Sequence, residues 1–180
     1  MAAWYAVQDE AVVRHDKTEI ARRFNEQMYP GAPEQTLSEH PGLTTWFLWA
    51  EFFGWGWPLK FATAETDFMP DATRRVRPVL SRLLPEADQE VPLGHFLIRL
   101  AEQCPELDGG RLFRRCWDAS RPNQERGNRL SLMLSTALRV LQREQLIELL
   151  ERKDATSWTL FPAQTQVPAA THIRRTEVRP

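Results

Sequence analysis

The 180-residue sequence is poor in cysteine, with two residues, Cys104 and Cys116, and no further pair near either. This number excludes a disulfide framework, and the twelve-residue separation does not match the ligand spacing of a structural zinc site. Histidine is sparse too, and its four residues are isolated, without an HExxH motif. We therefore expect two buried, reduced thiols in a cytoplasmic protein without a metal site.

A long hydrophobic run is also missing. The longest apolar region, residues 43–59, is interrupted by Glu51 and two glycines. It is shorter than the roughly 20 residues that a membrane-spanning helix needs. The first 13 residues include Asp9 and Glu10 and lack the apolar block of a signal peptide. The sequence therefore predicts no membrane partner.

Catalytic motifs are absent from the sequence as well. There is no GxSxG element, no Gly-Lys-Ser/Thr phosphate loop and no serine beside a recognisable base. Carboxylates are plentiful but scattered, and Asp71, in the small cluster with Glu65 and Asp67, is placed to cap a helix. We therefore predict a non-catalytic protein that uses no cofactor.

The charges that are present are distributed unevenly. The net charge is -1, but residues 1–110 carry 10 Lys and Arg against 17 Asp and Glu, whereas residues 111–180 carry 13 against 7. Such asymmetry can mark a nucleic-acid contact on the basic side. It can equally mean that the two halves attract each other or a partner.

Apolar periodicity predicts a mainly α protein. Asp16 is placed to cap the first clear helix, Pro78 should kink the central one, and Pro92 is suited to the first turn of the most regular one. Leu134, Leu138 and Leu141 mark the buried stripe of the last helix. The predicted helices cover residues 18–28, 33–39, 43–53, 71–84, 92–104, 111–118 and 129–145.

Four of the seven tryptophans lie between Trp46 and Phe61. Up to Phe53 the pattern predicts a helix that is apolar almost all round, and Gly54 fits its left-handed cap. Beyond the cap the period changes to two, which predicts an edge strand with its large side chains on one inward face, and residues 67–70 as the returning strand. The inward residues would be Trp55, Trp57, Leu59 and Phe61.

This aromatic stretch has three readings: the core of its own domain, a protein interface, or stacking on a ligand or base. Several aromatics in a row without flanking Arg or Lys fit the core best. As an interface, the contacting residues would be Trp46, Trp49, Phe53, Trp55 and Trp57.

A β-hairpin is predicted after the last helix, with residues 146–150 paired to residues 157–161 around a charged tip at Arg152, Lys153 and Asp154. The order of three helices and a hairpin in residues 92–161 resembles the winged helix-turn-helix superfamily. The segment STALRVLQREQLIELLERKDATSWTLF carries this resemblance most clearly.

Residues 16–70 fit the same template more loosely, so the resemblance implies an α+β fold that is mainly α with small β-hairpins, a tandem winged helix-turn-helix. The predicted parts are listed in chain order. They are an extended or loosely packed N-terminal arm (1–15), a first unit (16–70), a kinked connecting helix and linker (71–90), a second unit (91–165) and a flexible tail (166–180).

Bacterial proteins with such an architecture are of two kinds. Some are tandem winged-helix components of DNA-modification or anti-phage gene clusters, and others are dimers that bind the kleisin subunit of chromosome-organising SMC complexes. The resemblance therefore implies double-stranded DNA and a partner protein or a second copy of the chain as partners. The alternative is a protein–protein adaptor or dimerising scaffold without DNA readout.

In DNA-binding winged helices the third helix enters the major groove and the wing touches the backbone. Arginines around the last predicted helix can neutralise phosphates, and its polar stripe can read bases. The same stripe can instead be the solvated face of an amphipathic helix. The candidate DNA contacts are Arg114, Arg115, Arg126, Asn128, Arg129, Ser131, Ser135, Arg139, Gln142, Arg143, Arg152 and Lys153, with Arg121 nearby.

Overall fold

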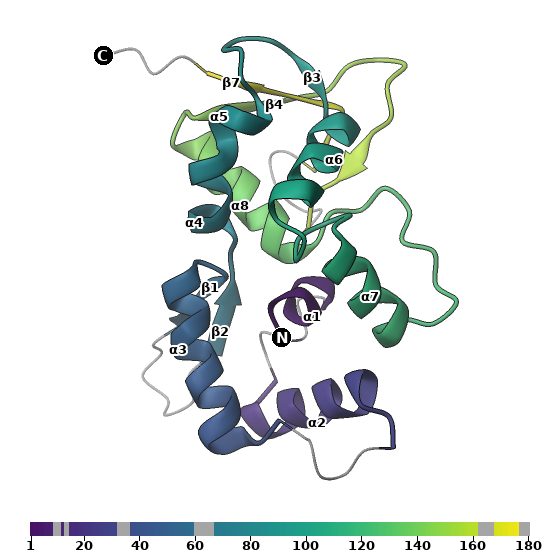
Figure 1. Ribbon diagram of the computed structural model, residues 1–180. Helices are drawn as coiled ribbons and strands as arrows, with labels where there is room; N and C mark the ends of the chain where they lie inside the picture. Colours follow the sequence, from purple (N-terminus) through teal and green to yellow (C-terminus); the bar gives the residue numbers. More distant parts are fainter. Residues whose placement is uncertain (9–11, 13–14, 32–36, 60–66, 162–167, 177–180) are drawn as a thin grey trace.

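The computed structural model describes the chain except for residues 9–11, 13–14, 32–36, 60–66, 162–167 and 177–180 (Figure 1). The fold class is α+β, with helices and, among the described residues, three small antiparallel sheets. Buried side chains from both halves of the chain, from Trp4 to Ile173, form one continuous hydrophobic cluster.

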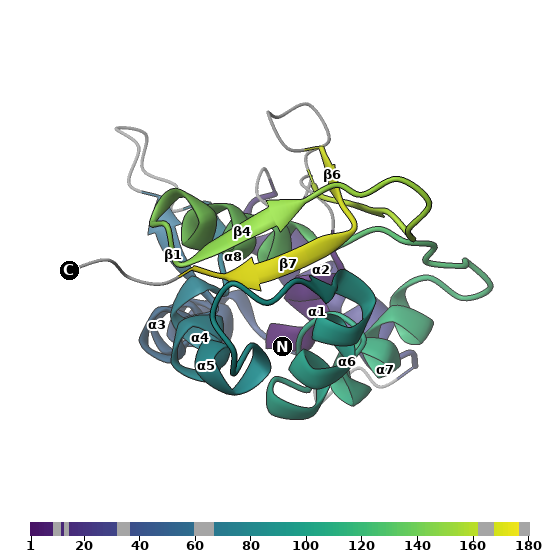
Figure 2. The same cartoon turned by 90° about the horizontal axis from the view of Figure 1, so that it is seen from above.

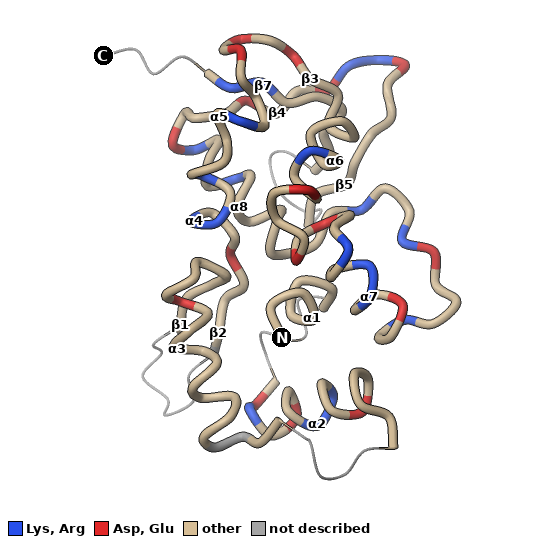
Figure 3. The backbone as a smooth tube through the Cα atoms, viewed as in Figure 1, with Lys and Arg blue, Asp and Glu red and all other residues tan. Residues whose placement is uncertain are grey.

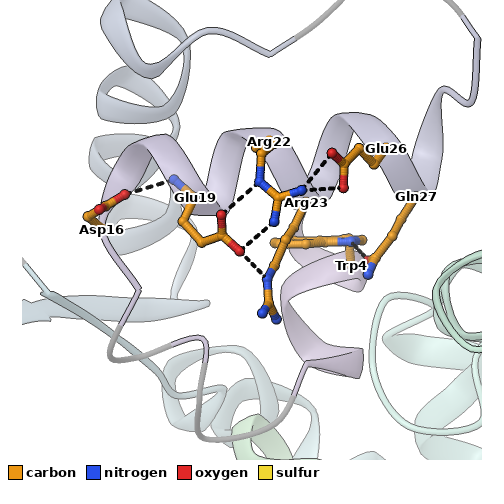
Figure 4. Close-up of polar contacts among 7 residues, drawn as sticks. All are labelled: Trp4, Asp16, Glu19, Arg22, Arg23, Glu26 and Gln27. Atoms are coloured by element: carbon orange, nitrogen blue, oxygen red, sulfur yellow. Dashed lines mark hydrogen bonds and ion pairs between the residues drawn. The ribbon is translucent and has the colours of Figure 1, made fainter.

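The first residues form a buried helix, α1 (Ala2–Val7), so the predicted loose arm over residues 1–15 is wrong for this segment. The indole of Trp4 meets Phe24 edge-on, with ring centroids 5.3 Å apart, and its Nε1 donates a hydrogen bond to Gln27 Oε1 at 2.6 Å (Figure 4). Tyr5 stacks on Trp46 at 5.1 Å. So short a helix is not stable alone in water, and tertiary packing holds it in place.

Helix α2 (Lys17–Met28) confirms the helix predicted over residues 18–28. Asp16 caps it, because its carboxylate accepts a hydrogen bond from the backbone N–H of Glu19 at 2.8 Å. On the outer face Arg22 bridges Glu19 and Glu26 (Figure 4). These exposed pairs order the helix surface but contribute little to stability.

A π-helical turn, η2 (Glu39–Leu43), leads into α3 (Thr44–Phe53). Most of the short helix predicted over residues 33–39 lies outside the described residues. Gly54 ends α3 with φ 76°, which confirms the expected left-handed cap. Strands β1 (Gly56–Leu59) and β2 (Asp67–Pro70) pair antiparallel, with Trp57 opposite Met69, so the returning strand is also confirmed. Phe61 lies outside the described residues.

The connecting segment consists of α4 (Thr73–Val76), the 3-10 turn η3 (Arg77–Val79) and α5 (Leu80–Leu83). The interruption falls at Pro78, as expected for a residue without a backbone N–H. The carboxylate of Asp71 accepts a hydrogen bond from the N–H of Thr73 at 2.8 Å at the start of this segment.

The second half begins with β3 (Val91–Pro92) and α6 (Leu93–Gln103), whose predicted stripe of Leu93, Phe96, Leu97 and Leu100 is buried. Helices α7 (Arg111–Ser120) and α8 (Leu132–Arg143) follow. Helix α8 begins three residues later than predicted, because the N–H of Leu130 donates to the carbonyl of Thr159 at 2.9 Å instead of joining the helix.

The strand pairing of the second half differs from the prediction. Strand β4 (Ile147–Leu150) pairs with β7 (His172–Arg175), and β7 also pairs with β3, so the sheet order is β3-β7-β4 (Figure 2). The shorter β5 (Trp158–Thr159) pairs with β6 (Ala169–Ala170). The predicted hairpin partner is therefore wrong, and the predicted flexible tail is wrong for residues 169–175, because this segment supplies the central strand and buries Ile173 completely. The rest of the predicted tail includes residues 166–167 and 177–180, which lie outside the described residues.

Candidate nucleic-acid interface and aromatic surface

Two of the predicted contacts, Arg114 and Arg115, are neighbouring exposed arginines on helix α7. Phe113 and Cys116 on the same helix are buried, whereas Arg111, Arg114 and Arg115 are exposed. Arg111 is not among the predicted contacts, although its position one helical turn before Arg114 and Arg115 places it on the same face. These guanidinium groups form a ridge that can meet phosphates.

Helix α8, in contrast, is a core helix. Ser135 is 0% exposed, and its Oγ accepts a hydrogen bond from the backbone N–H of Phe161 at 2.9 Å. Arg139 donates to the carbonyl of Phe161, and Gln142 is half-buried. The predicted solvent-facing stripe is therefore wrong for Ser135 and Arg139, because both side chains bond to the backbone of Phe161. Among the predicted contacts within α8, Arg143 alone is exposed.

A buried carboxylate organises the start of α8. Asp108 is fully buried and accepts hydrogen bonds from the N–H of Ser131 at 2.8 Å, from the Ser131 hydroxyl at 2.5 Å, and from the Arg126 guanidinium. Ser131 in turn caps α8 by accepting from the N–H of Leu134 at 3.1 Å. Two of the predicted DNA contacts, Ser131 and Arg126, thus have internal structural partners.

The remaining predicted contacts divide between internal and exposed positions. Arg152 is exposed two residues beyond the end of β4, where it pairs with Glu90 and its backbone N–H donates to Thr171 Oγ1 at 2.8 Å, so it is not at the tip of a β4–β5 hairpin. Asn128 and Lys153 are exposed. Asn128 lies in the loop between α7 and α8, and Lys153 lies in the loop after β4, so neither is part of the α7 ridge.

A cavity of about 250 Å³ opens between the end of α1, the inner side of α7 and the start of α8. Three arginines line it, and each guanidinium lies over an aromatic ring. Arg126 lies 4.5 Å from the centroid of Phe113, and Arg121 lies 5.0 Å from that of Trp117. Arg129 lies 5.8 Å from the centroid of Phe161. The structure thus brings Arg126, Arg129 and Ser131 together, as part of one lining.

The aromatic stretch is divided between the core and the surface. Phe52 is 74% exposed, Leu48 69%, Trp49 53% and Phe53 48%, whereas Phe47 and Ala50 on the opposite side are buried. Trp57 on β1 is 42% exposed, so the prediction that its face points inward is wrong for this residue. We call the five exposed residues the aromatic surface: Leu48, Trp49, Phe52, Phe53 and Trp57.

The rings of this surface pack on one another. Trp49 stacks on Phe53 with centroids 5.8 Å apart, and Phe52 meets both rings edge-on. Trp46 is half-buried against Tyr5, and Trp55 donates a hydrogen bond to the buried Glu106 at 3.2 Å. Of the predicted interface residues, Trp49, Phe53 and Trp57 are therefore in the aromatic surface, and Trp46 and Trp55 lie behind it.

Charges are almost absent from the aromatic surface and the elements that carry it. Between Thr44 and Pro58 the sequence has one charged residue, Glu51 (Figure 3). An exposed apolar patch of this kind marks a contact site in a folded protein. The period of α3 could not reveal the exposure, because a helix that is apolar all round looks the same whether it packs in its own domain or on another chain.

Both thiols are buried, as expected. Burial raises the pKa of Cys104 to about 11 and also raises the pKa of Cys116, so neither is an activated nucleophile at neutral pH. In the described part of the chain, no three His, Cys, Asp or Glu side chains gather where they could hold a metal ion. None of the described helices has the length and apolar character needed to cross a membrane.

Comparison with known proteins adds one finding. The model of the DpdG-like family matches residues 1–155, and this match links the chain to a DNA-modification or defence-type system. No curated protein and no solved structure matches the chain. Because the matched residues are most of the 180 in the sequence, the chain belongs to the DpdG-like family.

Proposed function

We propose that the chain is a non-catalytic subunit of a DNA-modification or defence-type system, which binds duplex DNA and docks onto another protein of that system. One observation carries this proposal: an arginine ridge on α7 and an uncharged aromatic surface on α3 and β1 occupy separate elements of one chain. Charge complementarity fits the first to a polyanion, and the exposed apolar area fits the second to a protein.

The DNA contact is proposed to be mainly with phosphates. The ridge residues Arg111, Arg114 and Arg115 are exposed, whereas Ser135 and Arg139 on α8 are bonded to the backbone of Phe161. Contacts to the phosphate backbone position a protein on DNA without reading its sequence. We therefore propose binding with low sequence preference, to which the exposed Asn128, Arg129, Arg143 and Lys153 add contacts outside the ridge.

We also propose that residues 91–175 are a variant of the winged helix. In support, three helices precede the strand β4, and the sheet order β3-β7-β4 places the last strand between two others. The variant differs in its last helix, because α8 is mostly buried and the residues between β4 and β7 include the extra β5-β6 pair. The exposed helix α7 replaces α8 as the DNA-facing element in this proposal.

Fluorescence anisotropy with a labelled duplex, measured from 50 to 200 mM salt, tests the DNA contact. We expect affinity to fall steeply with salt, because each neutralised phosphate releases counterions. The double variant Arg114→Glu/Arg115→Glu should bind at least about tenfold more weakly. Arg82→Glu, an exposed arginine on α5, is the matched control and should bind like wild type. Absence of binding at 50 mM salt would overturn the DNA contact.

The proposed occupant of the aromatic surface is another protein subunit with an apolar groove, acting in the DNA-modification or defence-type system to which the family match links the chain. Co-expression with the proteins of the same gene cluster should yield one that co-purifies with wild type and is lost with Trp49→Ser/Phe52→Ser. Light scattering on the purified chain alone shows whether the occupant is instead a second copy of the chain, because the chain would then be a dimer. A stable dimer that the same double variant converts to a monomer would overturn the proposal of a different subunit.

A second function is an adaptor without DNA contact. The observation that favours it is the internal engagement of several predicted contacts: Arg126 with Asp108, Arg139 with Phe161 and Arg152 with Glu90. In that case the α7 ridge meets an acidic protein. Loss of co-purification on charge reversal at Arg114 and Arg115, without any duplex binding, would support the adaptor and exclude the DNA-binding subunit.

A further inference from the structure

The cavity between α1, α7 and α8 is separate from the α7 ridge and from the aromatic surface. Its walls come from the end of α1 with Ala6 and Val7, from Trp117 on α7, and from Leu132 at the start of α8, with Phe161 at one side. Both apolar faces and charged groups therefore open into the same space of about 250 Å³. Apolar walls with a small number of placed polar groups are the usual composition of a ligand site.

The charged groups of the cavity have one predominant sign. Arg121, Arg126 and Arg129 line it against a single lining acid, Glu125. Asp108 lies beneath, fully buried, and accepts a hydrogen bond from the Arg126 guanidinium. An anchored guanidinium loses less freedom when a ligand binds, so the site is partly organised in advance. The cavity is therefore suited to an anion.

The aromatic rings add a second preference. Phe113 and Trp117 lie nearly parallel, with centroids 6.3 Å apart and an interplanar angle of 15°. Each ring has a guanidinium over it, at 4.5 Å for Phe113 and 5.0 Å for Trp117. Guanidinium planes and aromatic rings are the surfaces on which unpaired bases stack, and guanidinium groups also bind phosphate oxygens with paired N–H donors.

We propose that this cavity binds a single nucleotide, with its phosphate on the N–H groups of Arg121 and Arg129 and its base against the guanidinium planes that lie over the Trp117 and Phe161 rings. A cavity of about 250 Å³ is small for a drug-sized ligand, which limits the occupant to one nucleotide unit. The same chemistry is offered by a free nucleoside monophosphate and by one unpaired nucleotide of a DNA strand. If the source is DNA, the inference rests on the proposed function and extends it from the backbone to one unstacked base.

The experiment titrates the full chain by calorimetry with four probes. They are dAMP, deoxyadenosine, inorganic phosphate, and a single-stranded dA octanucleotide. We expect deoxyadenosine and phosphate each to bind at least about tenfold more weakly than the nucleotide, because each lacks one of the two recognised groups. Binding of dAMP identifies a free nucleotide as ligand, and binding of the octanucleotide without dAMP identifies a DNA strand.

Two variants connect the binding to the cavity. Arg121→Gln and Arg129→Gln each remove one charge at a partly or fully exposed position, and each should weaken the bound probe about tenfold. Arg82→Gln on α5 removes the same charge outside the cavity and should leave affinity unchanged. Thermal unfolding of each variant confirms that the fold is retained.

Two outcomes would overturn the inference: no binding of dAMP or of the octanucleotide, or binding that neither cavity variant weakens. The duplex assay on Arg114 and Arg115 is independent, because neither residue lines this cavity. A chain that binds duplex DNA through the ridge but no nucleotide refutes the cavity proposal alone. A chain that binds dAMP but no duplex refutes the ridge alone.

Discussion

The backbone N–H of Phe161 donates a hydrogen bond to the Oγ of Ser135 at 2.9 Å, and this contact ties the segment after β5 to the polar side of α8. The carbonyl of the same residue accepts from Arg139. Both groups of one peptide residue are therefore satisfied by side chains that the sequence pattern places on an open face. This arrangement determines which surfaces of the second half remain accessible to a partner.

The substitution Ser135→Ala tests this contact. It leaves the N–H of Phe161 without its acceptor in a partly buried position, which should lower the free energy of unfolding by about 1–2 kcal/mol. Urea unfolding followed by circular dichroism measures the change. Ser81→Ala, at an exposed position of α5, is the control and should stay within about 0.5 kcal/mol of wild type.

The affinity of Ser135→Ala for duplex DNA is an independent test of the same contact. Because Ser135 is 0% exposed, its loss should leave DNA binding unchanged. A variant with wild-type stability and weakened DNA binding would contradict the position of Phe161 and restore Ser135 as a contact.

Elements governed by local signals were predictable from the sequence. The carboxylate of Asp16 caps α2, Gly54 ends α3 in the left-handed region, and Pro78 interrupts the connecting helix, each as expected. These features depend on backbone chemistry within one turn, so a single sequence is enough to find them. The apolar stripe of α6 was equally clear, because its period is uninterrupted from Leu93 to Leu100.

Features that depend on distant segments were not predictable. Helix α1 has six apolar residues without a capping side-chain hydrogen bond, so no local signal separates it from a loose arm. The residues of β4 were assigned to the nearest apolar segment, whereas their partner β7 lies beyond a long insertion. The predicted DNA contacts on α8 were unreliable for the same reason, because their exposure depends on Phe161, a distant residue that bonds to Ser135 and Arg139.

Ile173→Ala tests the role of the C-terminal strand. Ile173 is fully buried on β7, which lies between β3 and β4. Removing its side chain should cost about 2–5 kcal/mol, the range for large-to-alanine changes in a core. Arg174→Gln, on the same strand as Ile173, removes an ion pair with Glu148 of β4 and should cost at most about 1 kcal/mol. Equal stability of Ile173→Ala and wild type in urea unfolding would mean that the strand is detached.

The buried thiol of Cys104 predicts a pH dependence. Its pKa rises to about 11 from an ordinary value near 9, because burial disfavours the thiolate. Between these values the unfolded chain loses the proton and the folded chain keeps it, so the unfolding free energy should fall as pH rises from 9 toward 11. Below pH 9 the thiol keeps its proton in both the folded and the unfolded chain, so its full contribution to the unfolding free energy is present.

The measurement compares wild type with Cys104→Ala from pH 7 to 10.5 by urea unfolding. The stability difference between them should shrink above pH 9, since only wild type loses the thiol contribution. A difference that stays constant over this range would show that the thiol ionises normally in the folded chain.

The aromatic surface predicts a separation of stability from association. Phe52 is 74% exposed, so Phe52→Ser removes little buried area and should change the unfolding free energy by less than about 1 kcal/mol. Binding of a hydrophobic fluorescent dye should decrease, because the exposed ring is part of the apolar patch. Phe47→Ser, on the buried side of the same helix, should instead unfold the protein or cost several kcal/mol. Equal effects of the two variants would contradict the exposed orientation of α3.

A double-mutant cycle tests the coupling of Asp108 and Arg126. Asp108→Asn removes the buried charge that accepts from both Arg126 and Ser131, and should cost about 2–4 kcal/mol. Arg126→Met keeps the stem over Phe113 but leaves the carboxylate without this partner, which should also destabilise the fold. Combining the two removes both members of the pair, so the double variant should cost less than the sum by about 1–3 kcal/mol. Strict additivity would mean that the guanidinium is not held by Asp108, and that the nucleotide cavity lacks its anchored arginine.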